Sequence, residues 1–288
     1  MAVTVRRSAA EGLVRSCAGR DWVTTAAPAE GVEILRAWFG GRAYDRHRHD
    51  TYAIGVTEAG VQTFDYRGRT ERSVPGKVVV LHPDEMHDGR AGTAAGFGYR
   101  IVYVDPARIA AAIRARGGRP TPLPFVREPV SSNPMLARAV TAAFQLPAEP
   151  LAFDTWVVQL AEGLLSAGPG SPAAAAGIRL DLPALERARA FLDGCRAVAR
   201  SAELEVVTGL SRYDLARQFR AAYGTSPYRY SLMRRLELAR SRLGVAPLAE
   251  LALAAGFVDQ AHFTRMFRAT FGLPPGRYAA LRRQASPS

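Results

Sequence analysis

Two related stretches decide the fold of this chain: DQAHFTRMFRATFGLPPGRY, Asp259–Tyr278, and SRYDLARQFRAAYGTSPYRY, Ser211–Tyr230, which lies 48 residues earlier. Eight of the twenty aligned positions are identical: Arg217/Arg265, Phe219/Phe267, Arg220/Arg268, Ala221/Ala269, Gly224/Gly272, Pro227/Pro275, Arg229/Arg277 and Tyr230/Tyr278. A helical pattern followed by a glycine turn therefore occurs twice in this chain.

Each of the two predicted helices has an apolar face and a polar face. At about 100° per residue, Phe263 and Phe271 fall about 40° to either side of Phe267, which predicts a buried aromatic face. The buried residues expected in the first copy are Leu215, Phe219 and Tyr223. The opposite faces carry hydrogen-bonding side chains and an arginine.

A short helical stretch and a glycine turn precede each copy, in SAELEVVTGLS and in PLAELALAAGFVD. Two helices joined by a tight turn, the second with a polar outer face, are typical of a helix-turn-helix unit. Ser211 and Asp259 are suited to cap the second helix of each unit. Between the units, Ser226–Leu243 predicts a helix of about 27 Å. Since successive major-groove segments lie about 34 Å apart, this helix could hold both recognition helices against one face of DNA.

Basic residues are concentrated in the C-terminal third of the chain. From Asp181 to the end there are 17 arginines and nine acidic residues, and the whole chain has a net charge of +12. A basic balance of this kind favours a polyanionic partner, and with two helix-turn-helix units it predicts double-stranded DNA.

From about Leu185 to Arg282, the chain resembles the tandem helix-turn-helix domain of AraC/XylS-type transcription regulators. The resemblance is carried by GLSRYDLARQFRAAYGTSPYRY, by RRLELARSRL and by LALAAGFVDQAHFTRMFRATFGLPPGRYAALRR, which covers most of the family signature. One position departs from the pattern: Glu205 precedes Gly209 where the second unit has the small residue Ala252. The resemblance implies a sequence-specific DNA-binding regulator, with RNA polymerase as a further partner.

The outer faces of the two recognition helices supply the candidate DNA contacts. Those expected at base edges are Arg212, Tyr213 and Arg217 in the first unit and Gln260, His262 and Arg265 in the second. Arginine can bond guanine at two positions and glutamine can pair with adenine, whereas tyrosine or histidine can contact phosphate or a thymine methyl group. Arg220 and Arg268, at the edge of each face, suit phosphates. The alternative for any single arginine is a solvated surface charge.

The front of the chain has a β pattern from about residue 32 to residue 104. Short apolar runs (VEILRAWF, TYAIGV, VQTFDY, KVVVL and GYRIVYV) alternate with Gly, Pro and charged turns, which predicts a small sandwich or barrel. Helical patterns follow in ARIAAAIRARGG and over Asn133–Leu146 and Leu151–Ala167. We therefore expect an α+β chain of two domains. Its expected parts are an N-terminal arm (1–30), a barrel with flanking helices (31–167), a Gly/Pro/Ala-rich linker (168–181) and an all-helical domain (182–288).

Four of the five histidines lie in this front region. Gly41, His47 and His49 match the first motif of a cupin-type barrel, and Pro83 and His87 loosely match the second, so the region resembles that fold. In AraC-type regulators such a barrel commonly senses a small molecule. The candidate effector-binding residues are Arg46, His47, His49, Tyr66, His82, Glu85 and His87, with Tyr99 or Tyr103 on the last strand. A polar or anionic small molecule suits this set, and the alternative is that the histidines satisfy hydrogen bonds at strand ends.

A metal site is the other reading of these histidines, because three neutral imidazoles would suffice to hold Zn, Fe or Ni. The metal-binding motif also carries a glutamate four or five residues after its second histidine, where this chain has Ala53 and Ile54. The sequence therefore favours a ligand pocket and predicts no metal, no cofactor and no enzymatic activity. The runner-up is a cupin-type metalloenzyme with a DNA-binding appendage.

Composition excludes several other classes. No apolar run approaches the length of a membrane-spanning helix, so we expect no membrane partner. Cys17 and Cys195 are the two cysteines, which argues against a disulfide framework or a cysteine zinc site and suits the cytoplasm. Neither lies in a setting suited to the nucleophile of a DNA-repair methyltransferase. The helices at 133–146 and 151–167 are the expected surface of a homodimer, with packing against the barrel as the alternative.

Overall fold

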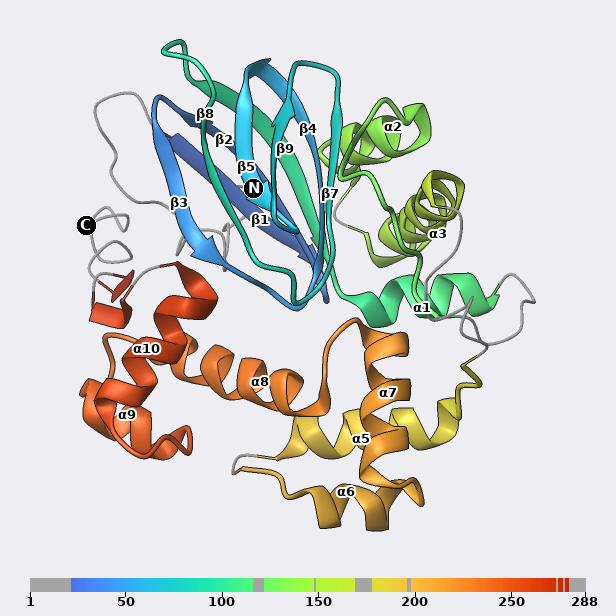
Figure 1. The fold of residues 1–288 in the computed structure, drawn as a ribbon, viewed down its shortest axis with the longest axis vertical. Coiled ribbons are helices and arrows are strands. Elements are labelled where there is room, and N and C mark those ends of the chain that lie inside the picture. The colour runs from blue at the N-terminus through green and yellow to red at the C-terminus, as the bar shows by residue number, and fades with distance from the viewer. Residues whose placement is uncertain are drawn as a thin grey trace.

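The computed structural model describes residues 22–115, 122–147, 149–168, 178–195, 198–272, 274–276 and 278–279. Within the described residues, the N-terminal domain has ten strands: β1 (Trp22–Ala29), β2 (Val32–Phe39), β3 (Arg42–His47), β4 (Tyr52–Gly60), β5 (Gln62–Tyr66), β6 (Arg69–Ser73), β7 (Val78–Leu81), β8 (His87–Ala91), β9 (Phe97–Val104) and β10 (Val130–Ser131). They make a six-stranded sheet in the order β1-β2-β9-β4-β7-β10 and a four-stranded sheet in the order β3-β8-β5-β6. The two sheets face each other as a cupin-like barrel (Figure 1).

The central strands β4, β7 and β9 of the six-stranded sheet are buried on both faces, which explains their nearly continuous apolar runs. Side chains alternate along a strand, so Ala53 points into the barrel core while Ile54 packs in the cluster outside it. Ile54 is paired with Val102 on β9 and with Val80 on β7, and all three are fully buried. The barrel interior is filled largely by aromatic side chains of β2, β5 and β9.

Three helices cover the outer face of this sheet: α1 (Pro106–Ala115), α2 (Pro134–Ala143) and α3 (Pro150–Ala167) (Figure 1). Trp156 of α3 is buried and donates its indole N–H to the Ala139 carbonyl at 2.7 Å. A Cβ at Gly163 would lie 2.7 Å from a methyl of Leu136, so glycine permits the close approach of α2 and α3. The apolar face of α3 therefore packs against α2 and α1, whereas Leu151 at its start is 76% exposed.

The C-terminal domain is helical: α5 (Leu182–Gly194), α6 (Ser201–Thr208), α7 (Arg212–Tyr223), α8 (Pro227–Ser241), α9 (Leu248–Ala254) and α10 (Gln260–Phe271). One core joins α5, α6 and α7 around Phe219, and another joins α8, α9 and α10 around Phe267; both rings are fully buried. The predicted buried faces are confirmed. The spacer helix α8 is about 22 Å long and runs below the barrel between the two units (Figure 1).

The expected N-terminal arm extends into the first strand of the barrel. Residues 22–29, which the sequence assigned to an N-terminal arm, form β1, an edge strand paired with β2. The rest of that arm (1–21) and most of the expected linker (169–177) lie outside the described residues. Among the helices that the structure describes, none has the length and apolar character needed to cross a bilayer.

Candidate nucleic-acid interface and effector cavity

The two helix-turn-helix units share their local construction. Ser211 Oγ accepts the Asp214 N–H at 3.2 Å at the start of α7, and Asp259 Oδ1 accepts the His262 N–H at 2.6 Å at the start of α10. Both predicted caps are thus confirmed. The turn glycine of each unit, Gly209 or Gly256, has φ near +72°, in the left-handed region that favours glycine.

An arginine fixes the turn of each unit from the helix that precedes it. Arg187 of α5 donates to the carbonyls of Val207 and Thr208, both at 2.9 Å. Arg235 of α8 donates to the carbonyls of Ala255 and Gly256 at 3.2 and 3.1 Å. The arginine and the two carbonyls of the second unit each lie 48 positions after those of the first. The repeat therefore also includes the helix that precedes each unit. The sequence comparison began at Ser211 and Asp259 and so missed Arg187 and Arg235. An alignment with the same 48-residue spacing, continued toward the N-terminus, would have paired them.

On the first recognition helix, α7, two of the candidate base contacts are held by acidic neighbours. Glu205 accepts two guanidinium bonds from Arg212, at 3.0 and 3.1 Å, and its backbone N–H at 2.9 Å. These bonds lower the pKa of Glu205. The carboxylate that departs from the family pattern therefore links α6 to the start of α7. Arg217 pairs with Asp214 at 2.7 Å, whereas Tyr213 is 81% exposed.

The second recognition helix, α10, presents Gln260 and Arg265 to the surface, and the His262 ring packs edge-on against Phe257 at 5.3 Å. The end of α10 packs on strand β3 of the barrel. Arg268 there lies 3.9 Å from the Asp45 carboxylate. The candidate phosphate contact of the second unit is thus beside the barrel, whereas its counterpart Arg220 is exposed on α7.

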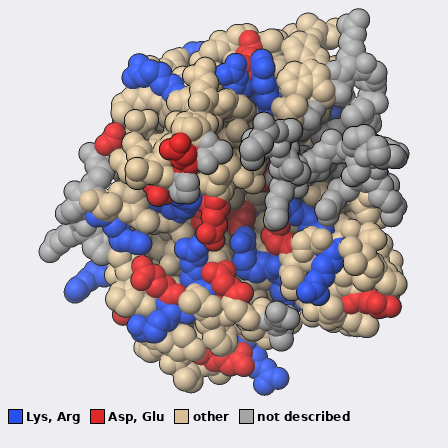
Figure 2. Space-filling view, turned by 180° about the vertical axis from the view of Figure 1, so that it is seen from behind, with Lys and Arg blue, Asp and Glu red and all other residues tan. Residues whose placement is uncertain are grey.

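Ion pairs join the helical domain to the barrel. Arg229 donates to Asp84 at 3.1 Å, and Arg234 donates to Asp50 at 2.5 Å. A backbone bond also crosses the boundary, because the Leu123 N–H donates to the Ala221 carbonyl at 3.0 Å. Basic and acidic side chains intermingle over the lower part of the face in Figure 2, where the helical domain lies. The described structure therefore has the two domains docked.

A cavity of about 490 Å³ lies between the domains, and we call it the interdomain cavity. The barrel side contributes Ala27, Ala29, Glu30, Gly31, Val32, Glu33, His47, His49, Asp50, Thr51, Tyr103, Asp105 and Pro106, and the helical domain contributes Tyr223, Tyr230, Met233, Arg234, Glu237, Arg240, Thr270 and Phe271. Its volume is that of a small-molecule site. Glu237 forms an ion pair with Arg240 at 2.6 Å, and burial raises the pKa of Glu237.

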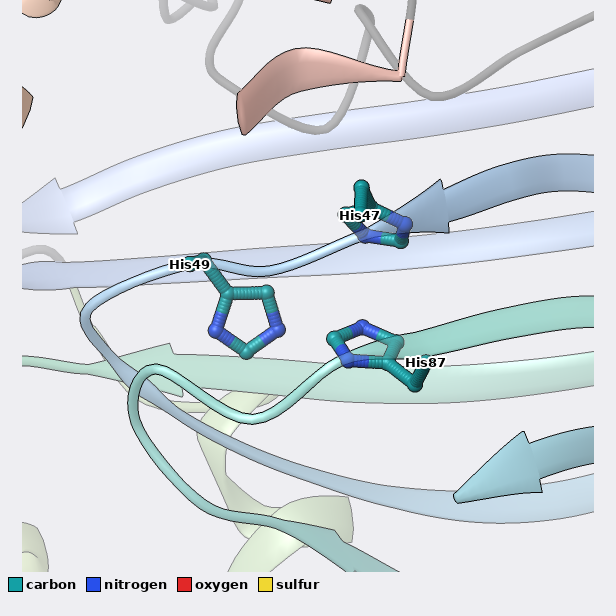
Figure 3. A group of neighbouring side chains, drawn as sticks. All are labelled: His47, His49 and His87. Atoms are coloured by element: carbon teal, nitrogen blue, oxygen red, sulfur yellow. The ribbon is translucent and has the colours of Figure 1, made fainter. Parts of the chain in front are cut away.

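His47, His49 and His87, here called the histidine triad, lie close together (Figure 3). One ring nitrogen of each lies within 4.8 Å of the others, and His47 and His49 line the cavity. Burial lowers the pKa of all three: to about 3 for His49, to about 4 for His87 and well below the usual range for His47. Their mutual repulsion lowers the pKa of His47 and His49 further, so the triad is neutral near pH 7.

Four other candidate effector residues lie elsewhere. His82 Nε2 accepts the Val126 N–H at 3.0 Å, and its ring also contacts Tyr66 and Arg67. Glu85 pairs with Arg67 at 2.6 Å, so Tyr66, His82 and Glu85 form a separate network outside the cavity lining. Arg46 lies in an open hollow beside Arg265 and Arg268. Of the two tyrosines considered on β9, Tyr103 lines the cavity, and Tyr99 packs in the barrel core.

Comparisons with known families agree with this two-part construction. The family model described as the AraC-like ligand binding domain matches residues 31–153, and that of a helix-turn-helix domain matches residues 206–281. The chain is an AraC-type regulator. It carries an N-terminal sensing domain and a C-terminal DNA-binding domain, as the sequence predicted. A comparison with curated proteins finds no match to this regulator.

Solved structures share the fold of this AraC-type regulator along most of its length. ToxT from Vibrio cholerae O395 superimposes with a TM-score of 0.58 at 10% identity, over 88% of this chain and 98% of that one. Wild-type ToxT of Vibrio cholerae strain SCE256 with a bound unsaturated fatty acid gives a TM-score of 0.54 at 13% identity, over 94% and 99%. At these identities the similarity establishes the arrangement of the fold.

Proposed function

We propose that this AraC-type regulator is a cytoplasmic transcription factor whose small-molecule effector binds in the interdomain cavity and controls how the two recognition helices engage DNA. The observation that carries the proposal is that both domains line one cavity, the barrel through His49 and Tyr103 and the helical domain through Met233 and Phe271. In this proposal the chain acts by binding and catalyses no reaction.

The physical basis is a difference in effector affinity between docked and undocked domains. An effector in the cavity touches both domains only while they are docked, so its binding shifts the docking equilibrium. Docking also places the end of α10 against β3, with Arg268 beside Asp45. The second recognition helix is therefore the part of the DNA interface that docking constrains.

The cavity lining favours an amphipathic effector. Val32, Met233 and Phe271 offer apolar surface, while Arg234 and Arg240 offer donors. Those two guanidiniums already pair with Asp50 and Glu237, so a ligand head group has to compete with a protein carboxylate. The unsaturated fatty acid of the ToxT structure is an amphipathic molecule of the same general class.

A cavity-filling substitution tests the location of the site. Met233 is buried at the lining, and Met233→Trp adds bulk there; Val74→Trp adds similar bulk at an exposed turn and is the matched control. A panel of amphipathic acids, amides and alcohols is screened by thermal shift and by binding to the upstream DNA. We expect a ligand that raises the Tm of wild type and Val74→Trp, leaves Met233→Trp unchanged and alters DNA affinity. A ligand that stabilises all three proteins equally places the effector elsewhere.

Homodimer formation and contact with RNA polymerase stay predictions. A homodimer formed through α2 and α3 would use the exposed apolar side chains that remain after packing on the barrel, including Leu151 and Leu165. Contact with RNA polymerase follows only from the family resemblance. Light scattering of the purified protein measures whether it dimerises, and transcription reconstituted with RNA polymerase tests the second contact.

A further inference from the structure

The three rings of the histidine triad come together at the adjacent ends of β3 and β8. His47 lies at the end of β3, His49 follows it, and His87 begins β8 on the paired strand. The register places His47 opposite His87, and their ring centroids are 4.3 Å apart. Three imidazoles from two neighbouring strands thus meet at one end of the barrel (Figure 3).

Backbone carbonyls fix the tautomer of each ring. Nδ1 of His47 lies 2.8 Å from the Asp45 carbonyl, Nδ1 of His49 lies 2.9 Å from that of Thr51, and Nδ1 of His87 lies 2.9 Å from that of Glu85. A carbonyl only accepts, so each Nδ1 carries the proton and each Nε2 keeps its lone pair. A histidine ligand to a metal commonly has this outer hydrogen bond, which orients the ring.

Two of the Nε2 atoms in the triad are buried and, among the described residues, have no hydrogen-bond partner. These atoms belong to His47 and His49. Leaving a buried polar atom unsatisfied is costly, so each such atom calls for a ligand, an ion or a water molecule. Because both atoms are acceptors, the missing partner is a donor or a cation.

The surrounding charge favours a cation. The carboxylate residues that line the interdomain cavity are Glu30, Glu33, Asp50, Asp105 and Glu237, and the guanidinium residues are Arg234 and Arg240. Acidic side chains therefore outnumber basic ones beside three neutral imidazoles. A divalent cation at the triad would gain from this balance.

We propose that His47, His49 and His87 bind one divalent first-row transition-metal ion through their Nε2 atoms, with further coordination positions open to the interdomain cavity. Imidazole nitrogens suit zinc, cobalt, nickel and iron, and three protein ligands with an open position make an accessible site. The sequence argued against a metal because Ala53 and Ile54 occupy the place of a motif glutamate. The convergence of three nitrogens supplies a ligand set without that carboxylate.

The distances require a modest adjustment. Nitrogens about 2.0–2.1 Å from one tetrahedral ion lie about 3.4 Å apart. One nitrogen of each ring lies within 4.8 Å of the others, so a pair of these nitrogens is at most about 1.4 Å farther apart than a shared ion requires. Rotation of the imidazoles about their side-chain bonds supplies movements of this size.

Cobalt binding to the full chain tests the site. Tag-free protein is stripped with a chelator and titrated with Co²⁺, and the visible absorption bands of the bound ion are recorded. We expect one Co²⁺ per chain with the intense bands of a four- or five-coordinate ion. His47→Ala and His87→Ala should lose this binding, whereas His262→Ala, which removes a histidine outside the triad, should keep it. A folded wild-type protein that binds no stoichiometric cobalt overturns the proposal, as does equal binding by the triad variants.

A second measurement needs no substitution and so remains decisive if a triad variant does not fold. In wild-type protein labelled with ¹⁵N in histidine, addition of Zn²⁺ should move three of the five Nε2 resonances and leave the other two in place. Unchanged resonances, or a shift confined to one histidine, contradict a three-nitrogen site.

A small anion then tests the open coordination positions. Azide added to the cobalt-loaded protein should shift the visible bands saturably, and bands that do not respond contradict access from the cavity. These measurements contain neither DNA nor effector. Failure to bind metal therefore leaves the effector proposal standing, and failure of the Met233→Trp test leaves the metal site standing.

Discussion

Asp84→Asn is expected to loosen the docking of the helical domain on the barrel. Asp84 is largely buried, has φ of +61° and accepts from Arg229 across the domain boundary. Asparagine tolerates this left-handed conformation, so the substitution removes charge with little backbone strain. A hydrogen bond to a charged group contributes about 1.5–3 kcal/mol, and a loss of about 2 kcal/mol shifts the docking equilibrium about 30-fold.

The reporter is the amide of Leu123, whose N–H donates to the Ala221 carbonyl in the other domain. Hydrogen exchange at this amide should accelerate about 30-fold in Asp84→Asn if exchange proceeds through undocking. Asp65→Asn is the control, because it breaks the Arg90 pair within the barrel and should leave Leu123 unchanged. An unchanged Leu123 rate in Asp84→Asn, or equal acceleration in both variants, would refute the reasoning that this ion pair holds the domains together.

Three further predictions concern single side chains. Burial holds the pKa of His82 at about 3, so as pH falls below about 6.5 the unfolded state binds a proton that the folded state does not. Between about pH 7.5 and about pH 5, the free energy of unfolding of wild type should therefore fall by about 2 kcal/mol more than that of His82→Gln, as urea unfolding would measure. Equal decreases in the two proteins contradict this prediction. Arg265→Ala should weaken binding to the specific site by about 1–3 kcal/mol and relax its sequence preference, whereas Arg268→Ala should weaken all duplexes alike and reduce the salt slope by about 1, as a fluorescence titration would show. Arg235→Met removes the hydrogen bonds to the second turn and should lower the free energy of unfolding by about 2 kcal/mol. Arg242→Met, at an exposed position, is the control and should leave the Tm unchanged. An equal Tm in both variants contradicts this role of Arg235.

The helical domain could be predicted closely because its signals are local. The spacing of Phe263, Phe267 and Phe271 gives the buried face directly, and Ser211 and Asp259 stand at the helix starts that they cap. The partner of Glu205 was not predicted. It bonds Arg212 seven residues later, across a turn whose geometry has to be known before the contact can be seen.

The candidate effector site was predicted less completely because its contacts are made between distant segments. His47 and His49 share a motif, but His82 and His87, which are near neighbours in the sequence, lie in different environments. Arg234 reaches the cavity from the other domain, and no local pattern marks it as a partner of Asp50. The residue types indicated a pocket, and only the docking of the domains defines its lining.

Footprinting of the protein on its own upstream DNA tests the central claim most directly, because two recognition helices on one spacer should leave a pattern that a single helix-turn-helix cannot. We expect two protected major-groove segments on one face of the duplex, about 34 Å apart, with affinity that falls steeply as salt rises. Arg265→Ala should weaken one segment while the other remains. A single protected segment, or uniform protection without sequence preference, would contradict the account.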